Sequence, residues 1–112
     1  MVSLFFAKTY TNINAFIEKE GLSISREWVM WKRSNSELYI ELEFVDFVAA
    51  FEFMGRVAEL AEEHQHHPNW SNVYNKLSIS LTTHDAGGIV TQKDHALAEA
   101  ISLLEGFNSA VA

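Results

Sequence analysis

The spacing of apolar residues along the 112-residue chain predicts three helices. Between residues 12 and 20, apolar side chains recur every three or four positions, and Gly21 follows where a helix cap is expected. A longer helix is predicted from its N-cap, Asp46, to about His64. It must end before Pro68, because the residue ahead of a proline is pushed out of helical dihedral angles. Its apolar face is expected to comprise Phe47, Ala50, Phe51, Met54, Ala58 and Ala61.

Alternation with a period of two predicts four strands. Residues 28–32 and 38–44 read as strands joined by turn residues at 34–36, which is typical of a hairpin. A short strand is expected at 70–74, and another starts at Lys76 with apolar residues on one side only. We therefore expect one α+β domain over residues 1–112, of order α-β-β-α-β-β-α: two layers, with a four-stranded antiparallel sheet and three helices on one face.

The third helix is marked by apolar residues at positions 97, 101 and 104 and is expected to end at Gly106. Thr91 and Asp94 near its start have the spacing of a capping box, in which each side chain satisfies a helix-end amide at the other residue. This structural role is the first interpretation of Asp94.

Composition and charge restrict the function. Lys and Arg number 8 against 15 Asp and Glu, a net charge of −7, which disfavours nucleic acid as a ligand because such binding depends on cationic side chains. The chain has no cysteine, so disulfides, thiolate metal sites and cysteine nucleophiles are excluded. No apolar run is long enough to span a membrane, and the first residues do not resemble a secretory signal. We expect a soluble, cytoplasmic protein that needs neither a membrane nor nucleic acid as a partner.

Four of the five histidines lie near two predicted boundaries: His64, His66 and His67 at the end of the central helix, and His84 after the last strand. Imidazole both gives and takes protons near neutral pH, so such a group suits general acid–base catalysis. The alternative is structural, because a cation at a helix C-terminus is also favourable. The grouping of three histidines from two segments favours the catalytic interpretation.

A metal site is the competing interpretation of these histidines. The spacing from His64 to His67 does not match the helical H-E-x-x-H pattern of zinc enzymes. Asp85 is suited to orienting His84 or to forming a turn, and the two glycines that follow Ala86 allow the backbone freedom near a ligand. Trp70, close to the histidines, is suited either to covering a flat heterocycle or to packing in the core.

The histidine segments resemble the signature of the pterin-4a-carbinolamine dehydratases. The chain reads EEHQHHPNWSNVYNK from Glu62 to Lys76 and LTTHDAGG from Leu81 to Gly88. An acidic residue, Glu62, stands four positions before His-His-Pro, and an aromatic residue, Tyr74, follows six positions after the proline. A Thr-His pair ends ten positions after this tyrosine, and Asp94 lies beyond it. The family's fold agrees with the order of elements predicted above.

The resemblance implies dehydration of 4a-hydroxytetrahydropterin to quinonoid dihydropterin, in tetrahydropterin recycling. His66 and His84 would move the protons, in an order that the sequence leaves open, and His67 would bind and polarise the hydroxyl. The pterin is the substrate, and no metal or organic cofactor is implied. The residues that the resemblance places at the substrate are His66, His67, Pro68, Thr83, His84, Asp85 and Ala86, and those that support the site are Glu62, Trp70 and Asp94.

Relatives of this family also act as protein partners or assembly factors, so a non-catalytic binding module is the alternative function. Retention of all three histidines favours the enzyme. A polar sheet face and a free sheet edge further predict a homo-oligomer, a dimer or a tetramer, as in the family it resembles.

Overall fold

The computed structural model describes residues 30–111. The predicted helix at 12–20 and the start of the first predicted strand, residues 28–29, lie outside the described residues. The rest of that strand prediction was wrong at two positions, because Met30 is helical, Trp31 lies in a bend and the strand begins only at Lys32. Within them the elements run β1 (Lys32–Arg33), β2 (Leu38–Glu43), α4 (Phe47–His64), β3 (Asn69–Val73), β4 (Lys76–Leu81), the 3₁₀ turn η1 (His84–Ala86), α5 (Gln92–Ser102) and α6 (Phe107–Ala110).

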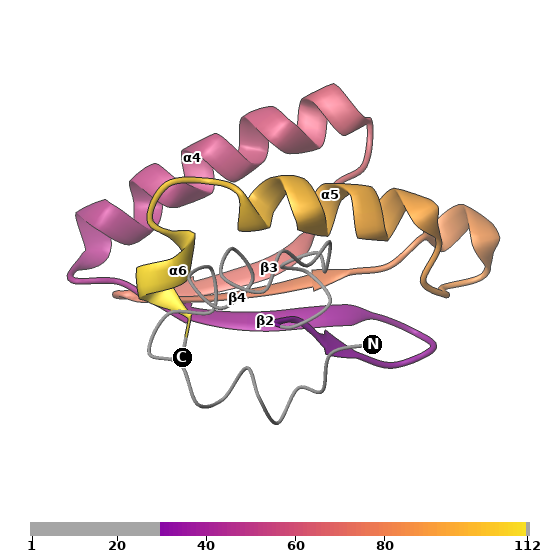
Figure 1. The fold of residues 1–112 in the computed structure, drawn as a ribbon, viewed down its shortest axis with the longest axis horizontal. Coiled ribbons are helices and arrows are strands. Elements are labelled where there is room, and N and C mark those ends of the chain that lie inside the picture. Colours follow the sequence, from indigo (N-terminus) through magenta and orange to yellow (C-terminus); the bar gives the residue numbers. More distant parts are fainter. Residues whose placement is uncertain (1–29, 112) are drawn as a thin grey trace, which may run out of the picture.

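The strands form one antiparallel sheet in the order β1-β2-β4-β3. The central pair is β2 and β4, which align Ile40 with Ile79. Helices α4 and α5 lie together on one side of this sheet (Figure 1). The predicted α+β class and the four-stranded antiparallel sheet are confirmed.

The hydrophobic core lies between the sheet and the helices. On β2 and β4 every second side chain is buried, as the period of two predicts. Trp31 closes one side of the core, where its indole N–H donates to the hydroxyl of Ser102 at 2.8 Å. The buried apolar cluster consists of Trp31, Leu38, Ile40, Leu42, Phe53, Val57, Leu77, Ile79, Leu81, Leu97, Ala98, Ile101, Phe107 and Ala110.

Helix α4 has the predicted bounds but turns a different face to the core. The carboxylate of Asp46 accepts from the backbone N–H of Ala49, so the predicted N-cap is confirmed. The buried positions are Ala50, Phe53, Val57 and Ala61, which recur every three or four residues. The expectation that Phe47, Phe51 and Ala58 belong to the core face was wrong; they are exposed because the chain offers two adjoining apolar stripes and the sheet covers only one.

Helix α5, the third helix that the sequence predicts, is shorter than expected. Helix α5 ends at Ser102, and Gly106 lies in a separate turn with a φ of 93°, as the N-cap of α6. Gly106 therefore starts the next helix rather than ending the previous one, and the prediction was wrong on this point. Glycine adopts a left-handed φ with little strain at either end of a helix, so the sequence alone does not distinguish a glycine that ends one helix from a glycine that caps the start of the next.

Leu97→Ala is expected to lower the free energy of unfolding by about 2 to 5 kcal/mol, because a fully buried leucine leaves a cavity that the core fills only in part. The matched control is Leu103→Ala, at a side chain that is 61% exposed, where the loss should stay within about 0.5 kcal/mol. Urea unfolding followed by tryptophan fluorescence measures both. Equal losses would contradict the burial of Leu97 and the exposure of Leu103.

Candidate active site

The end of α4 determines where His66 lies. Gln65 adopts a left-handed conformation with a φ of 53°, and its backbone N–H bonds back to the carbonyls of Ala61 and Glu62. The backbone N–H of His66 also returns to the Ala61 carbonyl, at 3.1 Å. This turn reverses the chain direction after the helix, as left-handed helix caps do, and the reversed chain leads through Pro68 into β3.

His66 is paired with Asp94 of helix α5. Its Nε2 lies 2.5 Å from Oδ1 of Asp94, and the two residues are 9% and 0% exposed. An ionised carboxylate only accepts hydrogen bonds, so Nε2–H of His66 is the donor. The other ring nitrogen, Nδ1, has no hydrogen-bond partner among the described residues. The pair therefore gives His66 a defined ring orientation and leaves Nδ1 available for another contact.

The other oxygen of Asp94 has two further donors. The hydroxyl of Thr83 donates to Oδ2 at 2.7 Å, and the backbone N–H of Thr91 donates to it at 2.8 Å. The predicted capping box of Thr91 and Asp94 is present. The same carboxylate thus caps α5 through Oδ2 and binds His66 through Oδ1, so the structural interpretation of Asp94 covers only one of its two oxygens.

Asp94 is ionised near neutral pH in spite of its burial. Burial alone raises the pKa of the Asp94 carboxyl, because a buried charge loses its hydration. The hydrogen bonds from His66, Thr83 and the Thr91 backbone, together with the charge of His66, act in the opposite direction and hold this pKa below its ordinary value of 3.8. At neutral pH a negative charge therefore lies against His66.

His67 has a carboxylate partner as well, but at the surface. Its Nε2 lies 2.6 Å from Oε2 of Glu62, one turn back on α4, and both side chains are mostly exposed. Exposed ion pairs contribute little to stability because water competes for both groups. Adjacent histidines are thus each oriented by a carboxylate through Nε2, His66 firmly and His67 loosely.

His84 follows directly after the buried Thr83 and begins η1. Its side chain is exposed and makes no hydrogen bond to the residues that the structure describes. Because Thr83 contacts Asp94 and Asp94 contacts His66, the two histidine-bearing segments meet at Asp94. The prediction that His66 and His84 transfer the protons stays a prediction.

The backbone of Thr83 is already bonded within the loop that follows β4. Its N–H donates to Ile89, and its carbonyl accepts from Ala86 and Gly88. Both its backbone and its hydroxyl are therefore engaged, whereas Asp85 and Ala86 lie exposed on η1. Substrate binding by Thr83, Asp85 and Ala86 stays a prediction.

Pro68 and Trp70 lie where β3 begins, and both are half-buried. Trp70 packs against the edge of the core and pairs in register with Ile79 of β4. Packing in the core therefore accounts for part of its surface. A role in covering a ligand stays a prediction.

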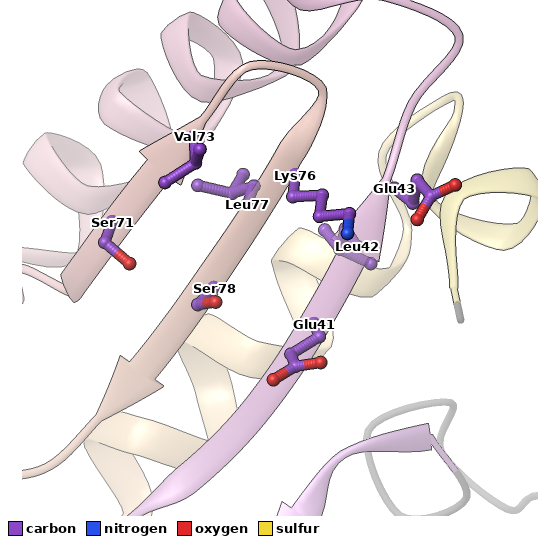
Figure 2. A pocket seen from close by; sticks show the side chains of 8 residues that line it. All are labelled: Glu41, Leu42, Glu43, Ser71, Val73, Lys76, Leu77 and Ser78. Atoms are coloured by element: carbon purple, nitrogen blue, oxygen red, sulfur yellow. The ribbon is translucent and has the colours of Figure 1, made fainter.

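A separate groove lies on the sheet face that carries the exposed side chains (Figure 2). It has a volume of about 260 Å³, and its cross-strand rows include Glu41 beside Ser78 and Glu43 beside Lys76. No histidine lines it. Within residues 30–111, no three His, Cys, Asp or Glu side chains are grouped closely enough to hold a metal ion, and none of the helices there is long and apolar enough to cross a membrane.

The sequence did not predict that Thr83 and Thr91 contact one another and that Thr83 binds Asp94. The hydroxyls of Thr83 and Thr91 lie 2.6 Å apart, and the first of them bonds to Asp94. The capping-box spacing predicted the contact between Thr91 and Asp94. No pattern of neighbouring residues predicts a contact of either residue with His66. The contact from His66 to Asp94 spans 28 positions and exists only in the folded chain.

These features define a small α+β protein with a histidine–carboxylate site. A family model described as Pterin 4 alpha carbinolamine dehydratase matches residues 11–104. A provisionally named pterin-4-alpha-carbinolamine dehydratase of Solibacter usitatus (strain Ellin6076) is 51% identical over 87 residues, 78% of this chain and 90% of that protein. One from Prochlorococcus marinus (strain NATL2A) is 46% identical over 92 residues, 82% of this chain and 87% of that protein. The chain belongs to the pterin-4a-carbinolamine dehydratase family.

Solved structures agree with the fold. The crystal structure of a transcriptional coactivator/pterin dehydratase from Brucella melitensis has a TM-score of 0.61 and 35% identity, and the match covers 65% of this chain and 79% of that one. A pterin dehydratase-like protein, identified as a RuBisCO assembly factor in the alpha-carboxysome, matches with a TM-score of 0.57 over 74% of this chain and 98% of its own. At 21% identity, this second likeness shows the fold alone.

Proposed function

We propose that this protein catalyses the dehydration of 4a-hydroxytetrahydropterin to quinonoid dihydropterin, in the recycling of tetrahydropterin. Membership of the dehydratase family supports the substrate class. The observation that carries the proposal is the His66–Asp94 pair, because it supplies a nearly buried imidazole with a defined orientation next to a second histidine.

The reaction is an elimination in which atoms and protons balance. The proton on N5 of the pterin is lost, the bond from C4a to the hydroxyl oxygen breaks, and the hydroxyl leaves as water after it gains a proton. A double bond forms between C4a and N5. One base and one acid near two adjacent ring atoms are sufficient, and no metal or organic cofactor is needed.

Two histidines of this chain suit the roles of acid and base, and a third suits binding of the hydroxyl. His66 has its Nε2 bound to Asp94, so Nδ1 would exchange the proton with the substrate. His84, without a bonded partner among the described residues, would serve as the second proton-transfer group, and His67 would bind the hydroxyl. Pro68, Asp85 and Ala86 would contact the pterin ring, and Trp70 would lie beside it.

The test is the loss of a synthetic 4a-hydroxytetrahydropterin, followed by absorbance with purified protein. We expect a rate well above that of the same buffer without protein. A rate no better than buffer would remove the enzyme proposal and would favour the alternative, a non-catalytic binding or assembly module of the same fold.

We further propose that the protein is a homo-oligomer of at least two subunits. Three large apolar side chains near the start of α4, Phe47, Val48 and Phe51, are 45%, 62% and 61% exposed. Within residues 30–111, strand β3 pairs with β4 alone, which leaves its other edge open. Apolar helix faces and open sheet edges are surfaces that proteins commonly cover by association.

Light scattering at micromolar concentration is expected to give at least twice the 12.7 kDa of one chain. Phe51→Glu should lower this mass, because a charge in an apolar contact loses its hydration without gaining a partner. Leu103→Glu, at a side chain with the same 61% exposure, should leave the mass unchanged. A wild-type mass of a single chain would contradict the proposal.

A further inference from the structure

A chain of hydrogen bonds leads from the start of α5 to His66 and passes through Thr83. Thr83 Oγ1 donates its only hydroxyl proton to Asp94 Oδ2, at 2.7 Å. It lies 2.6 Å from Thr91 Oγ1 as well. Because the Thr83 proton is already used, the Thr91 hydroxyl must be the donor in this second contact. The direction of the chain is therefore defined: Thr91 donates to Thr83, Thr83 to Asp94 Oδ2, and His66 to Asp94 Oδ1.

We infer that Thr83 is a positioning residue for His66: its hydroxyl, held by Thr91, orients the Asp94 carboxylate that orients the imidazole. The inference rests on the proposed role of His66 in proton transfer. It assigns to Thr83 a task distinct from contact with substrate, since Thr83 reaches the histidine only through Asp94.

Burial makes this arrangement effective. Thr83 is 6% exposed and Asp94 is fully buried, so water does not replace a missing donor easily. A carboxylate with donors on both oxygens has little freedom to rotate about its last bond. With Oδ2 fixed by Thr83 and the Thr91 backbone, Oδ1 is directed at His66 Nε2. That contact selects the tautomer in which Nδ1 is unprotonated.

The neighbouring residue provides a matched control. The hydroxyl of Thr82 is shielded from solvent and has no hydrogen-bond partner within the described part of the chain. Thr82→Val and Thr83→Val are therefore the same substitution at adjacent positions, and only the second removes a bond. Thr83→Ser keeps the hydroxyl and loses only a methyl group.

The experiment combines nitrogen-15 NMR of the His66 ring, at alkaline pH, with pterin kinetics on the full chain. In the wild type and in Thr82→Val we expect the proton on Nε2. In Thr83→Val we expect a mixture of the two tautomers and a fall in kcat of about tenfold, with a smaller change in KM. Thr83→Ser should restore both the tautomer and the rate, which a loss of packing alone would not predict.

The outcomes separate this inference from the proposed function. If Thr83→Val keeps the wild-type tautomer and the wild-type kcat, the positioning role is wrong. If no variant dehydrates the pterin but the tautomer shifts as expected, the enzyme proposal fails and the positioning role stands. Should Thr83→Val not fold, the wild type still decides: a slowly exchanging Thr83 hydroxyl proton supports the inference, and its absence together with a proton on Nδ1 overturns it.

Discussion

His66→Gln is expected to lower kcat for dehydration of 4a-hydroxytetrahydropterin by about 10²- to 10⁴-fold, the range that general acid–base catalysis contributes. The amide of glutamine retains a donor for Asp94, so the packing around the buried carboxylate is largely kept. It does not gain or lose a proton near neutral pH, so the acid–base step is removed. Steady-state kinetics on the synthetic pterin measures kcat and KM separately.

The control is the same substitution at His64, two residues earlier in the last turn of α4. The His64 side chain makes no hydrogen bond with the described residues and has no part in the proposed site. His64→Gln should retain the wild-type kcat. If His66→Gln also retained it, the assignment of His66 to proton transfer would be wrong, whatever the activity of the wild type.

Asp94→Asn is expected to lower the free energy of unfolding at neutral pH by about 2 to 3 kcal/mol. The amide oxygen can still accept from Thr83 and the Thr91 backbone, but the amide NH₂ then faces Nε2 of His66. Two donors would meet unless the proton of His66 moves to Nδ1. The variant should therefore lose activity as well, because the basic nitrogen would point at Asn rather than at substrate.

The pH dependence of this stability difference follows from the lowered pKa of Asp94. A group whose pKa is lower in the native state stabilises that state fully at pH values above its ordinary pKa, here 3.8. The contribution is lost as the pH falls through the lowered native pKa. The difference between wild type and Asp94→Asn should therefore be largest above about pH 4 and shrink below it.

Urea unfolding at a series of pH values measures this difference. Asp85→Asn is the matched control, because Asp85 is exposed on η1 and its loss should cost no more than about 0.5 kcal/mol at any pH. A difference for Asp94→Asn that stays unchanged into strong acid would show that the carboxylate is not ionised in the native state, which would contradict the lowered pKa of Asp94.

The sequence predicted the elements of this fold better than it predicted their contacts. The bounds of α4 follow from Asp46 and from the approach to Pro68, and both signals act over a few residues. The face that α4 buries was predicted less well, because Phe51 and Phe53 both lie on apolar stripes. The sheet selected the stripe of Phe53.

The candidate site divides in the same way. His66, His67 and His84 stand out in the sequence because their spacing around the His-His-Pro segment resembles a family signature, and the family is confirmed by the match over residues 11–104. Thr83 and Thr91 carry no such signal as partners of one another. Threonines at strand ends and helix caps are common, and both residues have local explanations for being there.

Taken alone, the sequence determined the strands β2, β3 and β4, the helix α4 with its N-cap, the capping box of α5 and the histidines of the family signature. Periodicity, capping and motif spacing are properties of neighbouring residues, so these features could be read from the chain; the separate helix α6 could not. Only the tertiary structure decided that Asp94 meets His66 across 28 positions, and that Thr83 meets Asp94 across 11. Those contacts depend on packing α5 against the end of α4 and the end of β4. The burial produced by this packing strengthens the hydrogen bonds that orient the His66 ring.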